Sequence, residues 1–349
     1  MDSMNGRVSA SLCILMMAWQ LAACSVDITQ GPQLDSTNLL PTWAGLHISG
    51  KLVYTAGERH GTNVLVAVRM LNLSTGDITT LFRTPAQGWV DSAAVSPDGK
   101  QIAISYVPPN GQQTIYMLPA DGSQPPQPLV APDQPGDRNS QAVWSPDGRY
   151  IYFVHMSQQN SGHPEIQRIA FPGGIVEIVV SNAAWPRLSP DSRELVYVHV
   201  DPETAVNRLF VTSADGTGQR QVTLSGGMIP NVIDAPMFSP DAQSILFSAP
   251  HSDESSAWKW LGSMLPIALI HAPHGSIPSD WWSVPVGGGV KQQLTHIPWL
   301  SLFGSYAPDN QHIATYTASG IFVMNPDGTG VTVVVSDTGG IPGTVNWIP

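Results

Sequence analysis

Short apolar runs of four or five residues recur along the chain, and polar or turn-forming residues separate them. The runs are rich in β-branched and aromatic residues, a composition that favours strands over helices. They read IAIS (102–105), YIYFV (150–154), LVYV (195–198), ILFS (245–248) and IATY (313–316). The pattern therefore predicts a chain built from many short β-strands.

A four-residue turn motif, Ser-Pro-Asp-Gly in its full form, precedes each of these runs. Pro at its second position sets φ for a type I turn, Asp bonds the local backbone, and Gly closes the turn. The five copies begin at Ser96, Ser145, Ser189, Ser239 and Ala307, so their starts lie 49, 44, 50 and 68 residues apart. This is the spacing of a four-stranded propeller blade.

A second repeat lies about twenty residues further on and gives an independent count of the blades. It consists of an alternating strand followed by a tight turn, usually containing Gly, which is a hairpin signal. Its six copies span 69–77, 116–122, 168–174, 210–216, 282–288 and 322–328. The innermost strand of a blade comes directly before its Ser-Pro-Asp turn. Six hairpins but only five such turns therefore leave the innermost strand of one blade unassigned.

The C-terminal segment Thr344–Pro349 resembles the residues before the second turn, AVWSP at 142–146. We therefore expect it to supply the innermost strand of the first blade, which joins the ends of the chain and leaves no open sheet edge. A competing candidate is Trp43–Leu46. The sequence predicts an all-β fold over 41–349: a six-bladed β-propeller with four-stranded antiparallel blades.

The long interval in blade 5 indicates an insertion at about 251–280. Its segment 257–272, AWKWLGSMLPIALIHA, is apolar on nearly all sides and is interrupted by Pro266. It is too short to span a bilayer. Two interpretations stay open: a flap packed on the outer face of blade 5, or an exposed element for a partner or the membrane interface.

The first 23 residues have the plan of a signal peptide. Arg7 precedes a largely apolar run, Ser9 to Leu21, and small residues stand directly before Cys24. This end resembles a bacterial lipoprotein box, which implies cleavage before Cys24 and lipidation of that residue. Residues 24–40 then form a tether. An ordinary secretory signal with an incidental cysteine is the alternative.

Composition narrows the possible partners. Charged residues make up only 12% of the chain, and the formal net charge is −11. No Lys/Arg cluster occurs, which argues against nucleic acid as a partner. The 63 Gly and Pro residues (32 and 31) fit short strands joined by tight turns.

Together the turn, the apolar run and the hairpin resemble the repeat of TolB-type, WD40-like (PD40) six-bladed propellers. The ending VNWIP is similar to the way that the TolB propeller finishes. The resemblance covers about 40–349 and implies the propeller fold. TolB carries an α/β domain ahead of its propeller, and we expect no room for that domain here. Some related propellers are lyases.

Few residues suggest catalysis. The aspartates of the repeated turns are expected to cap those turns. His155 and His199 end equivalent strands of blades 3 and 4, where Tyr106 stands in blade 2, and are weak candidates for a metal site. No carboxylate joins them at a ligand spacing, and ordinary strand histidines are the favoured interpretation. No GxSxG elbow or phosphate loop occurs, so we expect no cofactor.

The connections between blades are better candidates for binding, since in propellers they surround one mouth of the central channel. They carry five large apolar side chains in segments expected at the surface: Trp89, Trp185, Met228, Ile229 and Trp299. Exposed aromatic and Met side chains are typical of binding faces. The alternative is that these side chains fold back onto the blades.

The favoured interpretation is a non-catalytic protein-interaction or scaffold module of the bacterial cell envelope. It would be extracytoplasmic and anchored by lipid, in an outer or a cytoplasmic membrane. Envelope proteins or peptides are the expected partners, and a glycan is a further possibility. Two alternatives remain: a metal-dependent polysaccharide lyase or hydrolase, and a propeller that binds a small ligand or sugar.

Overall fold

The computed structural model describes residues 43–349, except 62, 132–133, 161, 205, 251–277, 298, 301 and 342. The predicted signal peptide (1–23), Cys24 and the tether (24–40) lie outside the described residues. So does most of the predicted insertion (251–280), which falls between the second and third strands of blade 5. Neither of the two short helices in the described part is long and apolar enough to cross a membrane.

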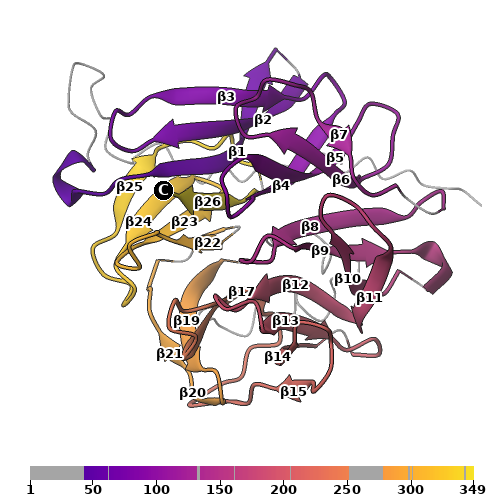
Figure 1. Ribbon diagram of the computed structural model, residues 1–349. Helices are drawn as coiled ribbons and strands as arrows, with labels where there is room; N and C mark the ends of the chain where they lie inside the picture. The colour runs from indigo at the N-terminus through magenta and orange to yellow at the C-terminus, as the bar shows by residue number, and fades with distance from the viewer. Residues whose placement is uncertain are drawn as a thin grey trace, which may run out of the picture. The chain divides into compact units, whose positions relative to one another are not determined.

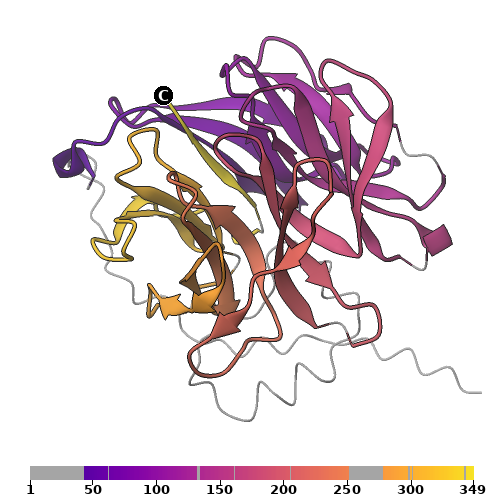
Figure 2. The same cartoon turned by 60° about the horizontal axis from the view of Figure 1, so that its bottom comes forward.

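Six four-stranded antiparallel sheets surround a central axis, as predicted (Figures 1 and 2). From the innermost strand outward, blade 1 consists of β26 (Val345–Ile348), β1 (Lys51–His60), β2 (Asn63–Asn72) and β3 (Ile78–Arg83). Blade 2 consists of β4 (Trp89–Val95), β5 (Gln101–Val107), β6 (Thr114–Pro119) and β7 (Gln127–Pro128). Blade 3 consists of β8 (Arg138–Trp144), β9 (Tyr150–Met156), β10 (Pro164–Ala170) and β11 (Val176–Ser181).

The remaining blades follow the same order. Blade 4 consists of β12 (Ala183–Leu188), β13 (Glu194–Val200), β14 (Asn207–Ser213) and β15 (Arg220–Gln221). Blade 5 consists of β17 (Asp234–Phe238), β18 (Ser244–Pro250), β19 (Ser279–Pro285) and β21 (Gln292–Gln293). Blade 6 consists of β22 (Phe303–Tyr306), β23 (Ile313–Thr317), β24 (Gly320–Met324) and β25 (Thr332–Val335). A small parallel pair, β16 (Leu224–Ser225) and β20 (Gly289–Val290), links blades 4 and 5.

The C-terminal strand closes the first blade, which confirms the prediction. β26 pairs with β1 in antiparallel register, with Lys51 opposite Ile348. Figure 1 shows the C-terminus beside the indigo strands of blade 1. Gly50 makes the junction possible, since its φ is +92° and an added Cβ would lie 2.3 Å from the Ile348 carbonyl oxygen. The competing segment Trp43–Leu46 is no strand, because Ala44–Leu46 forms the 3-10 helix η2.

The core lies between the blades. The second strand of each blade has a neighbouring blade on both of its faces, so both sets of side chains along it are buried. This explains the continuous apolar runs: Ile151 and Phe153 of β9 point away from Tyr152 and Val154, yet all four are at most 2% exposed. The apolar clusters therefore extend from one blade into the next.

The repeated turns have the predicted local chemistry. In the first copy the Ser96 hydroxyl donates to Asp98 Oδ1 over 2.6 Å, and the same carboxylate oxygen accepts from the Lys100 amide. The copies at Ser145, Ser189 and Ser239 repeat both bonds. These hydrogen bonds hold the pKa of Asp98 below its ordinary value. The aspartates of these four copies are therefore occupied in capping the turns.

Candidate functional site

Antiparallel blades sort their loops onto two faces. In each blade the turn after the first strand and the hairpin after the third lie on one side. The loop after the second strand and the connection to the next blade lie on the other. We call this second side the mouth face; its described loops include 84–88, 108–113, 134–137, 157–160 and 226–233.

A groove of about 630 Å³ opens on the mouth face between blades 2, 3 and 4. Its walls come from the loops that follow β5, β9 and β13 and from the connection that leads into β8. Both apolar and polar groups line it, among them Val107, Gln112, Met156, Gln158 and Val200. A concave site with this mixture can hold both apolar and polar groups of a ligand.

One buried carboxylate lies in this groove. Asp137 is 2% exposed, and its Oδ2 accepts from the Gln134 amide at 3.1 Å. Its Oδ1 is buried and has no hydrogen-bond partner among the described residues. Arg138, the next residue, is exposed at the same wall. Asp137 and Arg138 thus place a buried carboxylate and an exposed cation next to each other at this wall.

The two candidate histidines have different contacts: a hydrogen bond for His155 and a ring contact for His199. His155 is 8% exposed, and its Nδ1 lies 2.8 Å from Asn139 Oδ1. Because the Asn139 amide donates to Thr114 Oγ1, its oxygen is the acceptor and His155 Nδ1 carries the proton. His199 packs against Phe210, with ring centroids 5.2 Å apart, and burial lowers its pKa.

A metal site at these histidines therefore lacks support from the geometry. Within the described ranges, no group of three or more His, Cys, Asp and Glu side chains is placed to hold a metal ion. Tyr106, the equivalent residue of blade 2, is 7% exposed and packs edge-on against Phe82 and Tyr116. The three positions are equivalent along their strands, but their side chains have different partners. His155 and His199 contact residues of their own blades, whereas Tyr106 packs between Phe82 of blade 1 and Tyr116 of blade 2.

The five apolar residues proposed for the channel rim fall into two groups. Met228 is 52% exposed and Ile229 is partly exposed, as expected for a surface connection. The tryptophans are more buried than the sequence suggested: Trp185 and Trp299 are each 7% exposed, and Trp89 is partly buried against the core of blades 1 and 2. Trp299 stacks on Phe322 at 5.1 Å.

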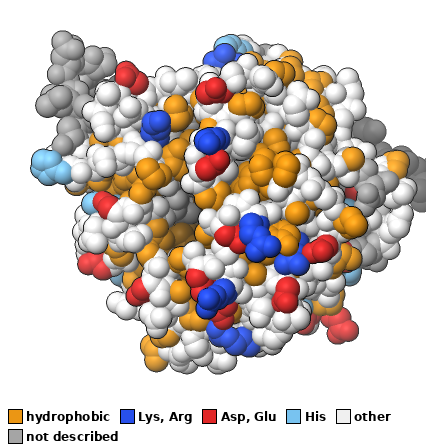
Figure 3. Space-filling model, viewed as in Figure 1, with side chains coloured by type: hydrophobic (Ala, Val, Ile, Leu, Met, Phe, Trp, Pro, Cys, Tyr) orange, Lys and Arg blue, Asp and Glu red, His pale blue; other side chains and the backbone are white. Residues whose placement is uncertain are grey.

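Two exposed side chains beside Trp299 were not singled out from the sequence. Ile297 is 43% exposed and Leu300 is 42% exposed, in the connection between blades 5 and 6. The backbone of Trp299 pairs with Ser279, which turns the indole toward blade 6. The face seen in Figure 3 carries scattered charges of both signs among uncharged and apolar groups.

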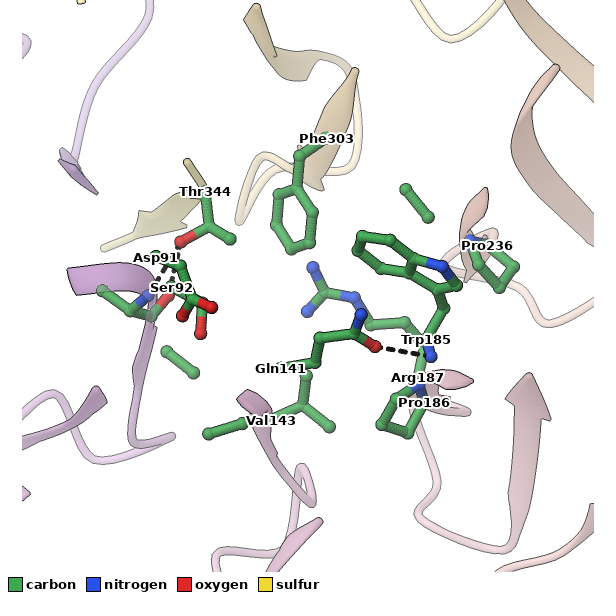
Figure 4. A pocket seen from close by; sticks show the side chains of 14 residues that line it. Asp91, Ser92, Gln141, Val143, Trp185, Pro186, Arg187, Pro236, Phe303 and Thr344 are labelled. Carbon is green, nitrogen blue, oxygen red and sulfur yellow. Dashed lines mark hydrogen bonds between the residues drawn. The ribbon is translucent and has the colours of Figure 1, made fainter. Parts of the chain in front are cut away.

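The central channel is lined by one equivalent position from each blade. In blades 2 to 6 it is the residue four places before the repeated turn, and in blade 1 it is the residue before β26. The six residues are Ser92, Gln141, Trp185, Ala235, Phe303 and Thr344. Figure 4 labels all of them except Ala235 and shows them around a narrow space, with the Arg187 guanidinium near its middle.

A bulge in each innermost strand of blades 2 to 5 accompanies this arrangement. The register shifts between Ser140 and Val143 in blade 3 and between Ala184 and Arg187 in blade 4. Gln141, Trp185 and Ala235 have φ of +53°, +59° and +45°, a backbone conformation that residues other than Gly rarely adopt. Bulges re-aim side chains and are enriched next to functional sites.

A scan of protein families supports the fold assignment. Residues 28–283 match the model described as PD40, TolB beta propeller domain. Among curated proteins, an uncharacterized protein of Agrobacterium fabrum strain C58, Atu1656, is 24% identical. That match covers 44% of this chain and 67% of the relative.

Solved structures share the architecture at low sequence identity. TolB from Acinetobacter baumannii superposes with a TM-score of 0.62 and 16% identity, over 86% of this chain and 67% of that one. A putative TolB from Agrobacterium tumefaciens gives 0.58 and 17%, over 86% and 99%. An oligogalacturonate lyase in complex with manganese gives 0.50 and 13%, over 82% and 86%. At these identities the likeness concerns the fold alone.

Proposed function

This chain belongs to the TolB beta propeller domain family, and on that premise we propose that it is a non-catalytic protein-interaction module of the bacterial cell envelope. A lipid on Cys24 would hold it at the membrane. The TolB structures that share its fold make an extracytoplasmic location the natural expectation. The N-terminal pattern that ends at Cys24 supports the anchor independently.

The groove on the mouth face carries this proposal. At about 630 Å³ it can take several side chains of a partner, and the loops of three blades wall it. Its apolar residues, among them Val107 and Val200, supply contact area, while Asp137 and Arg138 supply polar recognition. Met228, at 52% exposure, adds an adaptable apolar contact elsewhere on the same face.

A matched pair of substitutions tests the groove. Gln158 is exposed and lines it, whereas Gln124 is exposed in the hairpin after β6, on the opposite face. Gln158→Trp should fill the groove and reduce recovery of crosslinked partners from native membranes by about tenfold or more, the size of a hot-spot effect. Gln124→Trp should leave recovery unchanged.

The same two variants also show which results would contradict the proposed interaction site and the proposed function. If Gln158→Trp and Gln124→Trp recover the same partners in the same amounts, the groove is not the interaction site. If neither the parent protein nor Gln124→Trp yields a specific partner, while a glycan array gives a clear hit, the protein-interaction function itself is wrong. Melting curves of both variants establish that each is folded.

A further inference from the structure

One cation, Arg187, lies among the described residues that line the channel. It comes from β12, two residues after the bulged Trp185, and it is the only Lys or Arg among the fourteen described residues that line this space. Part of its surface is accessible, and its guanidinium lies near the middle of the channel. Burial lowers its pKa to about 10, which leaves it charged at neutral pH.

No acidic group of the described chain neutralises this guanidinium. Arg187 has no hydrogen bond or ion pair to a described residue, and its one specific contact is the face of the Phe303 ring, 4.2 Å away. Other arginines differ: Arg69 and Arg83 both bind Glu58, and Arg168 binds Glu177. A guanidinium taken out of water without an anion costs free energy.

Asp91, on the opposite wall of the channel, does not fill this role. Its Oδ2 accepts from the Gln113 side chain, its Oδ1 is buried, and it forms no ion pair with Arg187. Burial also raises the pKa of this carboxyl to about 6, which disfavours its charged form. The donors of Arg187 thus remain available, as Figure 4 shows them between Phe303 and Gln141.

The walls define what could reach Arg187. Trp185, Pro186, Pro236 and Phe303 give the space apolar sides. Its volume is about 20 Å³, enough for one small group and too little for a whole sugar or amino acid. A carboxylate is such a small group, and its two oxygens match the fork of a guanidinium in a bidentate contact.

We propose that the central channel is a binding site for a single carboxylate group, received by Arg187 between the rings of Trp185 and Phe303. The group could belong to a free small acid or to the C-terminus of a polypeptide. This site goes beyond the interaction function above, since it concerns the channel and not the groove on the mouth face.

Ligand-induced stabilisation tests the site without knowledge of the natural ligand. The melting temperature is followed against rising sodium acetate, with acetamide as the neutral probe of similar shape and sodium chloride to hold the ionic strength constant. Acetate should raise the melting temperature in a saturable way, because it binds the folded state alone. A triglycine peptide with a free C-terminus, compared with its amide, separates the two sources of the carboxylate.

Variants connect the effect to Arg187. Arg187→Met should abolish the acetate shift and leave the melting temperature of the free protein equal or higher. Arg187→Lys keeps the charge but lacks the fork, and should weaken apparent acetate affinity by about tenfold. Arg193→Met, at an exposed turn, is the control and should keep the full shift.

Three results would overturn the proposal. The parent protein could show no shift with acetate or with the free peptide, acetamide could act as strongly as acetate, or Arg187→Lys and Arg187→Met could keep the parent's shift. The outcome is independent of the Gln158→Trp experiment, so failure of one does not imply failure of the other.

Discussion

At the residue scale, the fourth position of the repeated turn shows how strongly local geometry acts on this chain. Gly99 and Gly148 have φ of +70° and +71° there. Ser192, Ala242 and Asn310 adopt the same left-handed backbone, with φ of +61°, +56° and +61°. Only Gly takes this conformation without cost. The copies without Gly therefore keep the same turn conformation, because the Asp hydrogen bonds and the strand pairing stabilise it.

Turn residues could be predicted because their chemistry is local, whereas burial of single side chains could not. Trp185 and Trp299 stand in connections that should be exposed, yet both are 7% exposed. Trp185 is turned into the channel by a bulge, and Trp299 stacks on Phe322 of the next blade. Neither contact has a signal within a few residues along the chain.

The buried Asp91 gives a prediction about pH. Burial raises its pKa from the ordinary 3.8 to about 6, although the Gln113 hydrogen bond acts in the opposite direction. The unfolded chain ionises this group first, so the native state loses stability as pH rises from about 4 to about 6. The difference corresponds to at most about 3 kcal/mol. Asp91→Asn should therefore gain stability relative to the parent at pH 8 and lose that advantage at pH 4.

Urea unfolding at both pH values measures the effect, and Asp98→Asn serves as its control. The pKa of Asp98 is lowered by its turn hydrogen bonds, so this carboxylate stabilises the folded state above its unfolded pKa. Asp98→Asn should be less stable than the parent at pH 8, and the deficit should shrink at low pH. A constant difference between Asp91→Asn and the parent at pH 8 and pH 4 would contradict the assignment.

At the scale of the strands, the inner and outer edges of a blade differ in burial and in the number of neighbouring strands. The innermost strands are packed on both sides and joined to the next blade; Val345 of β26 is fully buried, and Thr344 bonds the Ala93 backbone of blade 2. The outermost strands have one neighbour and expose apolar groups such as Val176 and Ile178 of β11. Strand number and order were predictable from the repeats, but the bulges were not, since they depend on packing around the channel.

This difference predicts the cost of losing contacts at the closing strand. Trp347 of β26 is 6% exposed, and its indole donates to the Ser49 carbonyl across the junction of the two chain ends. Trp347→Ala should destabilise the protein by about 3–5 kcal/mol. Ile175→Ala, at 87% exposure beside the outer strand of blade 3, should change stability by less than about 0.5 kcal/mol. Equal melting temperatures for the two variants would argue against closure through β26.

At the scale of the whole molecule, the repeat predicts the architecture but does not by itself show which residues line the channel. Six blades follow from counting turns and hairpins, because each blade is a local unit. The channel residues come from six segments between 91 and 344, so no single segment shows them together. Aligning the copies on their turns would have shown the lining position, and with it Trp185 and Phe303. Arg187 would then have stood out as the one cation near that position.

The proposed anchor gives the last prediction. If Cys24 is lipidated, Cys24→Ala removes the only acceptor for the lipid and should move most of the protein from the membrane fraction to the soluble fraction. Cys13→Ala is the matched control, since Cys13 lies within the segment expected to be removed, and it should leave the distribution unchanged. The propeller itself should keep its melting temperature in both cases, because the described core begins at residue 48. If Cys24→Ala stays in the membrane fraction to the same extent as Cys13→Ala, lipid on Cys24 is not what holds the protein there.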